Sequence, residues 1–433
     1  MKNAPGALIH AIPEFSATQS IKIAPNTSVP VTDRLLAIID SQTFQRLRAI
    51  RQLSLADRVF PSATHTRFSH ALGVYHNVLD YLRHLDRFPQ FHQSFDESDY
   101  LSVMLAGLLH DIGHYPCSHQ LDHLEGFPKH EQVTIDLIEG RLSYEGEDLS
   151  AIIRREFGLD PNMITRFFRR QHTVPLLRQM IDSPIDADKC DYLPRDSYFC
   201  GVDYGTGFDR QRFITNLMPN REGNSLCMHE KGLLSAERFQ LARYWMYRSV
   251  YWGHTVRALI TTLQQCCRQL TKVPSHHELL GFNDHSFFEW LWQQSNGDGR
   301  ELLRCIHGKR LPFKRVYTLA YNHDPDTYLK LQDESLRAQI IAKIKGGSSL
   351  SPHMLVWDVP PAYKTTNWET FAVRMNDGRE VPIEHESPVI KALGSAFLQG
   401  VRKIRLFAHP ATYQDLSLDR LPPIESLLKD LSL

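Results

Sequence analysis

The histidines of this chain are unevenly distributed, and imidazole is the side chain that most readily binds metals and moves protons near neutral pH. Ten of the 22 histidines lie between His65 and His130. Local enrichment of this kind is a compositional signal for chemistry rather than for packing alone. Carboxylates brought close to these histidines would complete a metal site or an acid–base site.

Four residues have the types and spacing of a metal site. His110 and Asp111 end an apolar run, His70 lies 40 residues before His110, and Asp188 lies 77 residues after Asp111. Two imidazoles and two carboxylates suit Mn, Fe, Zn or Co better than Ca, and on a six-coordinate ion they leave positions for water and substrate. This donor set is typical of a hydrolase. The competing interpretation is structural, because a His-Asp pair is common and can cap a helix.

The motifs around these residues resemble those of a known family. They are FQRLRAIRQL (44–53), FPSATHTRFSHALGVYH (60–76), AGLLHDIGHYPCSH (106–119), KHEQ (129–132), DADKCDYLPRDSYFCGV (186–202) and ARYWMYRSVY (242–251). In this order they resemble the HD-domain phosphohydrolases, and within them the deoxynucleoside triphosphate triphosphohydrolases. The resemblance implies one divalent metal ion at the four residues above, with Mg²⁺ as an ion that enters with the substrate.

The resemblance also implies catalytic roles for four residues: His114, His119, Asp122 and His130. The first two match histidines that contact the α-phosphate region, and His130 with Asp122 matches a candidate proton donor and its carboxylate partner. Such a pair suits a leaving 5′-oxygen that needs a proton near neutral pH. Independently, the i+4 spacing from His110 predicts that His114 shares its helical face. His123 and Glu131 remain alternatives for the donor.

Seven further residues match substrate contacts of the family: Arg67, Lys189, Tyr192, Asp196, Arg243, Tyr247 and Tyr251. The resemblance implies that Arg67 and Lys189 contact phosphate and that Tyr192 and Asp196 contact the sugar. It implies that the last three contact phosphate, sugar or base. The spacing of four along residues 243–251 predicts one stripe of a long helix, which half-buried packing would also explain. A surface ion pair is the ordinary alternative for Arg67.

Two departures from the family pattern bear on the substrate and on regulation. The family's aromatic-His-Lys is replaced by Trp252, Gly253 and His254, so one triphosphate contact is missing or is made by a histidine. The family's Asp-Pro-x-His-Gly is also absent. In regulated members of the family, that segment helps to form a nucleotide activator site together with positions that match Asp40, Gln45 and Arg48. These three residues are present, but Asp40 also fits a helix cap and Arg48 a surface charge, and these ordinary roles are favoured over an activator site.

These observations predict an enzyme that hydrolyses deoxynucleoside triphosphates to the deoxynucleoside and inorganic triphosphate, by attack of metal-bound hydroxide on the α-phosphorus. The first alternative is a phosphohydrolase of a nucleoside monophosphate, a cyclic nucleotide or a modified nucleotide. The second is a nucleotide or nucleic-acid sensor, which the basic stretches at 307–315 and 343–345 allow. The resemblance further implies a homo-oligomer, from dimer to hexamer.

Composition narrows the class of protein. Lys plus Arg is 49 and Asp plus Glu is 49, so the 433-residue chain lacks the excess positive charge of a dedicated nucleic-acid or membrane-surface binder. Seven cysteines without CxxC spacing suit reduced thiols in a cytoplasm. We see no signal peptide and no uninterrupted apolar stretch of membrane-spanning length, and therefore expect a soluble cytoplasmic protein.

The predicted fold is mainly α, with an all-α HD core and a smaller C-terminal α+β region. We expect an N-terminal arm at 1–31, either irregular or an edge strand, the core at 32–274 and the α+β region at 275–433. Within the core, the pattern predicts two short helices broken near residues 40–41, a helix at 67–85 and a buried helix capped by Ser98 or Asp99. It further predicts helices at 130–138, 149–157, 174–181, 187–199 with a kink or an early break at Pro194, and 235–270 with a local break at Gly253. Later segments predict helices at 287–294 and 325–344 and strands at 355–359, 370–375 and 403–409.

Overall fold

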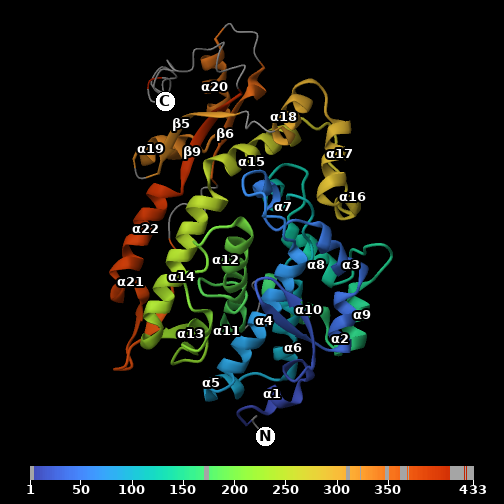
Figure 1. Cartoon of the computed structure of the whole chain (residues 1–433), viewed down its shortest axis with the longest axis vertical. Coiled ribbons are helices and arrows are strands. Elements are labelled where there is room, and N and C mark those ends of the chain that lie inside the picture. The colour runs from blue at the N-terminus through green and yellow to red at the C-terminus, as the bar shows by residue number, and fades with distance from the viewer. Residues whose placement is uncertain are drawn as a thin grey trace. The chain divides into compact units, whose positions relative to one another are not determined.

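The computed structural model describes residues 4–169, 175–308, 313–321, 323–346, 351–360, 368, 370–409, 424 and 426. The chain forms two compact units (Figure 1). The first contains Met1–Met246, Pro274–Phe287 and Glu369–Lys391, and the second contains Tyr247–Val273, Phe288–Trp368 and Ala392–Leu433. Each unit is therefore built from separate segments of the chain. The continuous division at 31/32 and 274/275 stays a prediction.

The first unit is mainly helical. Its α-helices are α1 (Ala7–Ala11), α2 (Asp33–Ile39), α3 (Gln42–Gln45), α4 (Arg67–Leu85), α5 (Pro89–His92), α6 (Glu97–Leu109), α7 (Ser118–Leu121), α8 (His130–Ile138), α9 (Leu149–Phe157), α10 (Pro161–Phe168), α11 (Pro175–Gln179), α12 (Ala187–Cys200), α13 (Arg210–Ile214), α14 (Leu233–Met246), α16 (His276–Gly281) and α21 (Ile383–Glu386). Two further helices, α17 (Asp284–Gln294) and α22 (Pro388–Gly400), span the boundaries between the units.

Two small sheets belong to the first unit. The hairpin β1 (Gln19–Ile23) and β2 (Thr27–Val31) is antiparallel, with Gln19 opposite Val31. The second sheet has the order β3 (Leu217–Pro219), β4 (Leu226–His229), β7 (Ala372–Arg374), β8 (Glu380–Pro382). Strands β4 and β7 are parallel, and the other pairs are antiparallel. The predicted N-terminal arm thus contains a paired hairpin.

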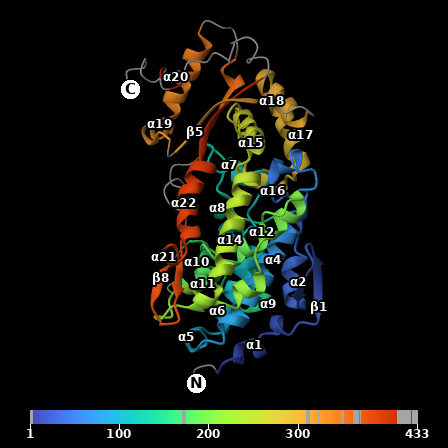
Figure 2. The ribbon, with the colours of Figure 1, turned by 60° about the vertical axis from the view of Figure 1, so that its left-hand side comes forward.

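The core of the first unit surrounds α4, which contacts both α6 and α12 (Figure 2). Helix α6 is buried from Tyr100 to Leu109, as its apolar sequence predicts. The predicted cap is wrong, because Asp96 caps the helix. Its side chain accepts the Asp99 N–H, and the Asp99 side chain accepts the Asp96 N–H in return. This reciprocal capping box satisfies two donors at once and so extends the helix to Glu97.

Helix α12 continues through Pro194, so of the two predicted alternatives, a kink or an early break, the break does not occur. Proline removes one helical hydrogen bond. The neighbouring side chains of Leu193 and Arg195 are buried, and this packing offsets the lost bond. At the start of the helix, the Asp186 side chain accepts the Lys189 N–H. The capped first turn fixes the position of Asp188.

The second unit has an α+β structure. Its helical segments are the π-helical Tyr247–Tyr251, α15 (His254–Cys267), α18 (Gly297–His307), α19 (Pro325–Lys330) and α20 (Glu334–Lys345). Its antiparallel sheet has the order β5 (Lys314–Ala320), β9 (Lys403–Ala408), β6 (Leu355–Asp358). The helix predicted at 325–344 is two helices, because Asp333 caps α20. The helix predicted at 235–270 is interrupted by the π-helical segment before Gly253.

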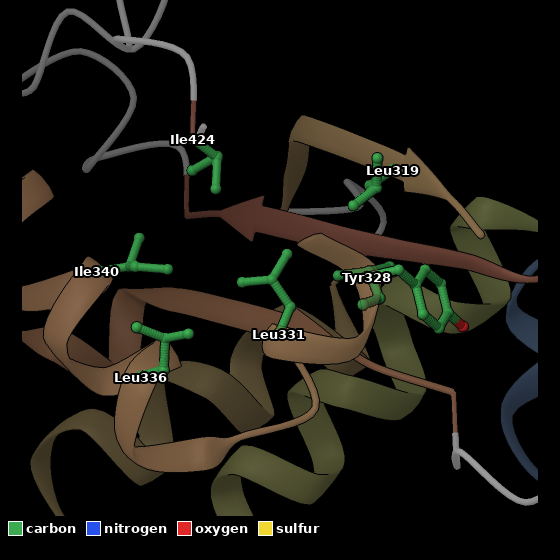
Figure 3. Close-up of a cluster of buried hydrophobic side chains, with 7 residues drawn as sticks. Leu319, Tyr328, Leu331, Leu336, Ile340 and Ile424 are labelled. Atoms are coloured by element: carbon green, nitrogen blue, oxygen red, sulfur yellow. The ribbon is translucent and has the colours of Figure 1, made fainter. Parts of the chain in front are cut away.

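A compact apolar cluster holds the second unit together. Figure 3 shows its side chains, which come from α19 and the residue after it, from α20, β5 and β9, and from position 424. All are buried: Leu319, Tyr328, Leu331, Leu336, Ile340, Ile404 and Ile424. Burial of apolar surface is the main stabilising contribution to such a unit. The predicted fold class, mainly α with a smaller C-terminal α+β region, is confirmed.

The structure also bears on the predictions about membrane-spanning segments and about the two basic stretches. None of the helices in the described ranges is long and apolar enough to cross a bilayer. The basic stretch at 307–315 falls partly outside the described residues, at 309–312, and Lys314 and Arg315 begin β5. Lys343 and Lys345 lie in the last turn of α20, where positive charge suits the carbonyl end of a helix.

Candidate metal centre

Three helices of the first unit bring metal-binding side chains together. His70 lies on α4, His110 directly follows α6, and Asp188 lies in the first turn of α12. The His70 and His110 Nε2 atoms are 3.3 Å apart, and the Asp188 Oδ1 atom lies 3.1 Å from the first and 3.8 Å from the second. The three donor atoms therefore lie within bonding reach of one ion.

Asp111 lies beside this group. Its Oδ1 atom is 3.4 Å from the His110 Nε2 atom, and its Oδ2 atom is 3.8 Å from the His70 Nε2 atom. Arg67 donates a hydrogen bond to Asp111 Oδ2 at 2.5 Å. Burial alone would raise the pKa of Asp111, but His110, His114 and Arg67 lower it well below its ordinary value. The carboxylate is therefore ionised and faces the two imidazoles.

The outer hydrogen bonds of both histidines fit a bound metal. His110 Nδ1 lies 2.9 Å from the Gly107 carbonyl, which can only accept, so this nitrogen carries the proton. His70 Nδ1 donates in the same way to Asp191 Oδ2 at 2.8 Å. Both Nε2 lone pairs are thus left for a metal, and a carboxylate or carbonyl holds each ring. The residues fit a divalent ion with mixed nitrogen and oxygen ligands.

The electrostatics around His70 lead to the same conclusion. Burial opposes its protonation, but the carboxylates of Asp188 and Asp191 raise the pKa of His70 to about 10. A field that holds a proton on a buried imidazole also attracts a metal cation. A metal ion and a proton therefore compete for the His70 Nε2 atom.

Sequence reasoning missed Asp191, which holds His70 from behind. Arg195 in turn donates to both Asp191 oxygens, from Nε at 2.8 Å and from Nη2 at 2.7 Å. A Cβ atom at Gly73 of α4 would lie 1.8 Å from Asp191 Oδ1, so glycine is needed for this close approach. The signal was present in the sequence, since Asp191 is three residues after Asp188 and four before Arg195 on one helix.

A second group of imidazoles lies beside the first. The His114 and His130 rings stack at 4.1 Å, and the His119 ring lies 4.6 Å from the former and 4.5 Å from the latter. His130 Nδ1 lies 2.7 Å from Asp122 Oδ2. Burial opposes ionisation of Asp122, but hydrogen bonds from His123 and His130 lower its pKa to about 2. The ionised carboxylate can support a protonated His130.

The predicted reason for the position of His114 is wrong. Helix α6 ends at Leu109, so His114 lies in the turns after the helix and not on its face. Its Nε2 atom nevertheless lies 3.0 Å from Asp111 Oδ1, and its Nδ1 atom lies 2.5 Å from Ser118 Oγ. Burial and the positive charge of Arg67 lower the pKa of His114 well below its ordinary value, so the ring is neutral.

Gly113 allows α8 to approach the turn that follows α6. Its N–H donates to Thr134 Oγ1 at 3.0 Å. A Cβ atom there would lie 2.2 Å from the Thr134 backbone nitrogen and 2.5 Å from the His130 carbonyl oxygen. The glycine thus positions the start of α8, and with it His130. The alternative donors His123 and Glu131 are both exposed.

The expected substrate residues of the first unit have varied surroundings. Lys189 Nζ donates to Asp186 Oδ2 at 2.8 Å. Asp196 is buried and lies 2.9 Å from His65 Nε2. Tyr192 is half-buried on α12, and Arg243 is buried on α14. Their roles toward a substrate stay predictions.

Tyr247 and Tyr251 lie in the second unit, in its π-helical segment, so they do not continue the α-helical stripe predicted from Arg243. Their rings are 5.2 Å apart at 82°, and the Tyr247 ring also contacts Phe397 at 5.7 Å. These contacts match the packing interpretation. A substrate role for the two tyrosines also stays a prediction.

The three activator positions have ordinary structural surroundings. Asp40 is the C-terminal cap residue of α2. The exposed Arg48 donates to Gln45 Oε1 at 2.7 Å, and its guanidinium lies 3.6 Å from the centre of the Phe68 ring. These contacts are those of a helix end and a surface charge.

Comparisons with known proteins place this geometry in a family. The HD domain model matches residues 67–196, and the HD associated region model matches residues 208–416. The uncharacterized protein YwfO of Bacillus subtilis is 32% identical over 249 residues, which are 56% of this chain and 54% of that protein. The deoxynucleoside triphosphate triphosphohydrolase SAMHD1 of Bos taurus is 30% identical over 377 residues, 71% of this chain and 62% of that protein. The chain thus spans about half the length of the first of these relatives.

Solved structures agree on the fold. A hypothetical protein from Aquifex aeolicus has a TM-score of 0.71 and 25% identity, covering 93% of this chain and 100% of that one. A phosphohydrolase from Bacteroides thetaiotaomicron has a TM-score of 0.67 and 22% identity, covering 90% and 99%. With the HD model spanning the helices that carry His70, His110 and Asp188, the chain belongs to the HD-domain family and resembles its deoxynucleoside triphosphate triphosphohydrolase branch.

Proposed function

We propose that this protein is a metal-dependent phosphohydrolase that converts deoxynucleoside triphosphates to the deoxynucleoside and inorganic triphosphate. The observation that carries the proposal is the convergence of His70, His110 and Asp188 beside the stacked His114 and His130. The first group provides metal ligands, and the second provides a proton donor within the same unit. Hydrolysis of a phosphate ester needs both.

The metal ligands in this proposal are His70, His110, Asp111 and Asp188. A divalent ion held there, of the Mn, Fe, Zn or Co type, would supply a Lewis acid for activating water and polarising a phosphoryl oxygen. Asp191 keeps the His70 ring in the ligand orientation, through the 2.8 Å hydrogen bond to Nδ1. Arg67 holds Asp111 and adds positive charge where a phosphate would bind.

The remaining chemistry belongs to the histidine group. A water molecule gives one proton to solvent and its oxygen bonds to the α-phosphorus, while the bond from phosphorus to the 5′-oxygen breaks and the 5′-oxygen takes a proton. His130 gives this proton, and the ionised Asp122 at 2.7 Å stabilises its charged form. His119 lies against the His130 ring and donates to phosphate oxygens, and His114 packs on the same ring beside the α-phosphate. Within the first unit, Lys189, Tyr192, Asp196 and Arg243 are the remaining proposed substrate contacts.

A product analysis tests this proposal. The protein is incubated with deoxynucleoside triphosphates, monophosphates and cyclic nucleotides, each with Mn, Mg, Fe or Co, and the products are separated. Release of intact triphosphate is the expected result, and Asp188→Ala or His110→Ala abolishes it in a folded protein. Full turnover by a metal-depleted Asp188→Ala variant would contradict the metal mechanism.

A second substrate separates the role of His130. The p-nitrophenyl ester of thymidine 5′-monophosphate has a leaving group that needs no proton. His130→Asn should slow hydrolysis of a deoxynucleoside triphosphate by about 10²- to 10⁴-fold, the usual contribution of a general acid. Hydrolysis of the activated ester should fall far less. An equal loss on both substrates would remove His130 from the proton-donor role.

A second candidate function is hydrolysis of a nucleotide with fewer phosphates. It is favoured by Gly253 and His254, which stand where the family has His-Lys. Partial burial together with the positive charges of Arg315 and Arg405 lowers the pKa of His254, so the lysine charge is not replaced. Release of single phosphate from a monophosphate, with no product from triphosphates, would favour this candidate. We also propose a homo-oligomer, which light scattering of the intact protein tests.

A further inference from the structure

Three chemically different donor groups converge in the second unit, on residues outside the motifs quoted above. Glu301 and Cys305 lie on α18, and His409 directly follows β9. One carboxylate oxygen, the thiol sulfur and one imidazole nitrogen all lie within 4.8 Å of one another. The donor atoms of His70, His110 and Asp188 also lie within 4.8 Å of one another.

The local structure explains why these side chains meet. Glu301 and Cys305 are four residues apart, so they project from one face of α18 on successive turns. The His409 backbone N–H donates to the Met354 carbonyl at 2.9 Å, which extends the pairing of β9 with the segment before β6. The His409 ring also packs edge-on against Phe313 at 5.7 Å. Helix and sheet therefore each present their donors from a fixed backbone.

The geometry suits ligands of one ion better than a hydrogen bond between them. The His409 Nε2 atom lies 3.8 Å from Glu301 Oε1, beyond hydrogen-bond distance. Bonds of about 2.0 Å to nitrogen and oxygen and about 2.3 Å to sulfur place tetrahedral zinc ligands roughly 3.3–3.7 Å apart. Arg304 donates to the other carboxylate oxygen, Oε2, at 3.0 Å and leaves Oε1 facing the histidine.

The site is also accessible. The Glu301 side chain is 38% exposed and the His409 side chain 12%, whereas Cys305 is buried. An ion can therefore enter from solvent at the carboxylate and reach the sulfur beneath it. A soft sulfur ligand beside imidazole and carboxylate selects zinc-type ions and disfavours Mg²⁺ and Ca²⁺.

We propose that Glu301, Cys305 and His409 bind a second divalent metal ion of the zinc type, with water as the fourth ligand. Binding replaces the thiol proton of Cys305 by the metal, and that proton is released to solvent. The ion then joins α18 to the end of β9, the central strand of the β5-β9-β6 sheet. Its donor set differs from that of the first centre, which contains no sulfur.

This difference in ligands allows a direct test with Co²⁺ as the probe. A thiolate bound to Co²⁺ gives a sulfur-to-metal charge-transfer absorption in the near ultraviolet, which imidazole and carboxylate ligands alone do not give. The full-length protein is titrated with Co²⁺, and bound metal is counted by mass spectrometry. We expect the absorption to appear, and Zn²⁺ to remove it by displacing the Co²⁺.

Variants then assign the absorption to this site. Cys305→Ser should abolish it and remove one bound metal, and His409→Asn should weaken Co²⁺ binding by at least about 10- to 100-fold, because even outer-shell changes have effects of that size. Cys227→Ser changes another buried thiol, on β4, and should leave the absorption intact. His110→Ala removes a ligand of the first centre and should also retain it.

Two results would overturn the proposal. One is a wild-type protein that binds Co²⁺ without any thiolate absorption. The other is an absorption that persists in a folded Cys305→Ser variant. The first result uses the unmodified protein, so the test does not depend on the folding of a variant. Neither result bears on hydrolysis at the first centre, and the two proposals stand or fall separately.

Discussion

The hydrogen bond from His70 to Asp191 makes a quantitative prediction about the first metal centre. Asp191→Asn keeps the shape of the side chain but removes the negative charge that faces His70 Nδ1 at 2.8 Å. Loss of such an outer-shell carboxylate weakens metal binding by about 10- to 100-fold. This change corresponds to roughly 1.4–2.7 kcal/mol. The variant also leaves the buried Arg195 without its carboxylate partner, so a lower Tm is expected as well.

The measurement is a calorimetric titration of metal-free protein with Mn²⁺, at a temperature where circular dichroism shows the variant to be folded. Asp182→Asn is the matched control, because it removes a carboxylate charge from the segment before α12 at an exposed position paired with Arg178. The control should bind Mn²⁺ within about twofold of the wild type, since a surface ion pair contributes about 0–1 kcal/mol. Equal affinity of Asp191→Asn and wild type would refute the orienting role of Asp191.

Three further predictions follow from the same contacts. Gly73→Ala places a methyl group 1.8 Å from Asp191 Oδ1, so the affinity for the metal should fall, although alanine favours the helix by about 1 kcal/mol. Gly232→Ala is the control, because its methyl group clashes with Met228 instead, and it should bind the metal with normal affinity in the same titration. Because the pKa of metal-free His70 is about 10, metal binding displaces a proton from His70 at neutral pH. The affinity for the metal should therefore rise with pH between 6 and 9 and level off above 10. An affinity that does not change with pH in buffered titrations would contradict this. Asp358 is fully buried between Arg257 and Arg405. Asp358→Ala should lower the free energy of unfolding by about 3–5 kcal/mol in a urea titration. An unchanged midpoint would show that these ion pairs do not stabilise the fold.

The sequence identified the candidate metal ligands, because residue types and short motifs indicate that chemistry. His110 and Asp111 directly follow a helix whose apolar residues surround it, and such a helix is buried in any fold. The bounds of α4, α8 and α9 follow from apolar periodicity and local caps, and the structure reproduces all three. The caps of α6 were misplaced, because Asp96, Ser98 and Asp99 are all good capping residues and only the geometry selects among them.

Tertiary structure decided the features that depend on distant parts of the chain. The place of His114 depends on where α6 ends, and the path of α12 through Pro194 depends on packing that offsets a lost hydrogen bond. The contact of Asp191 with His70 requires α12 to approach α4 at Gly73.

The second candidate metal site shows most clearly which features depend on contacts between distant parts of the chain. His409 lies 104 residues after Cys305, and neither residue belongs to a recognisable metal motif. The pairing of β9 with β5 and β6 fixes where His409 leaves the sheet, and the face of α18 fixes where the thiol meets it. Residue types and spacing along the chain thus determined which chemistry the first centre can perform. The folded chain alone determined which side chains orient that centre and where a second ion can bind, because both depend on contacts between segments that the sequence keeps apart.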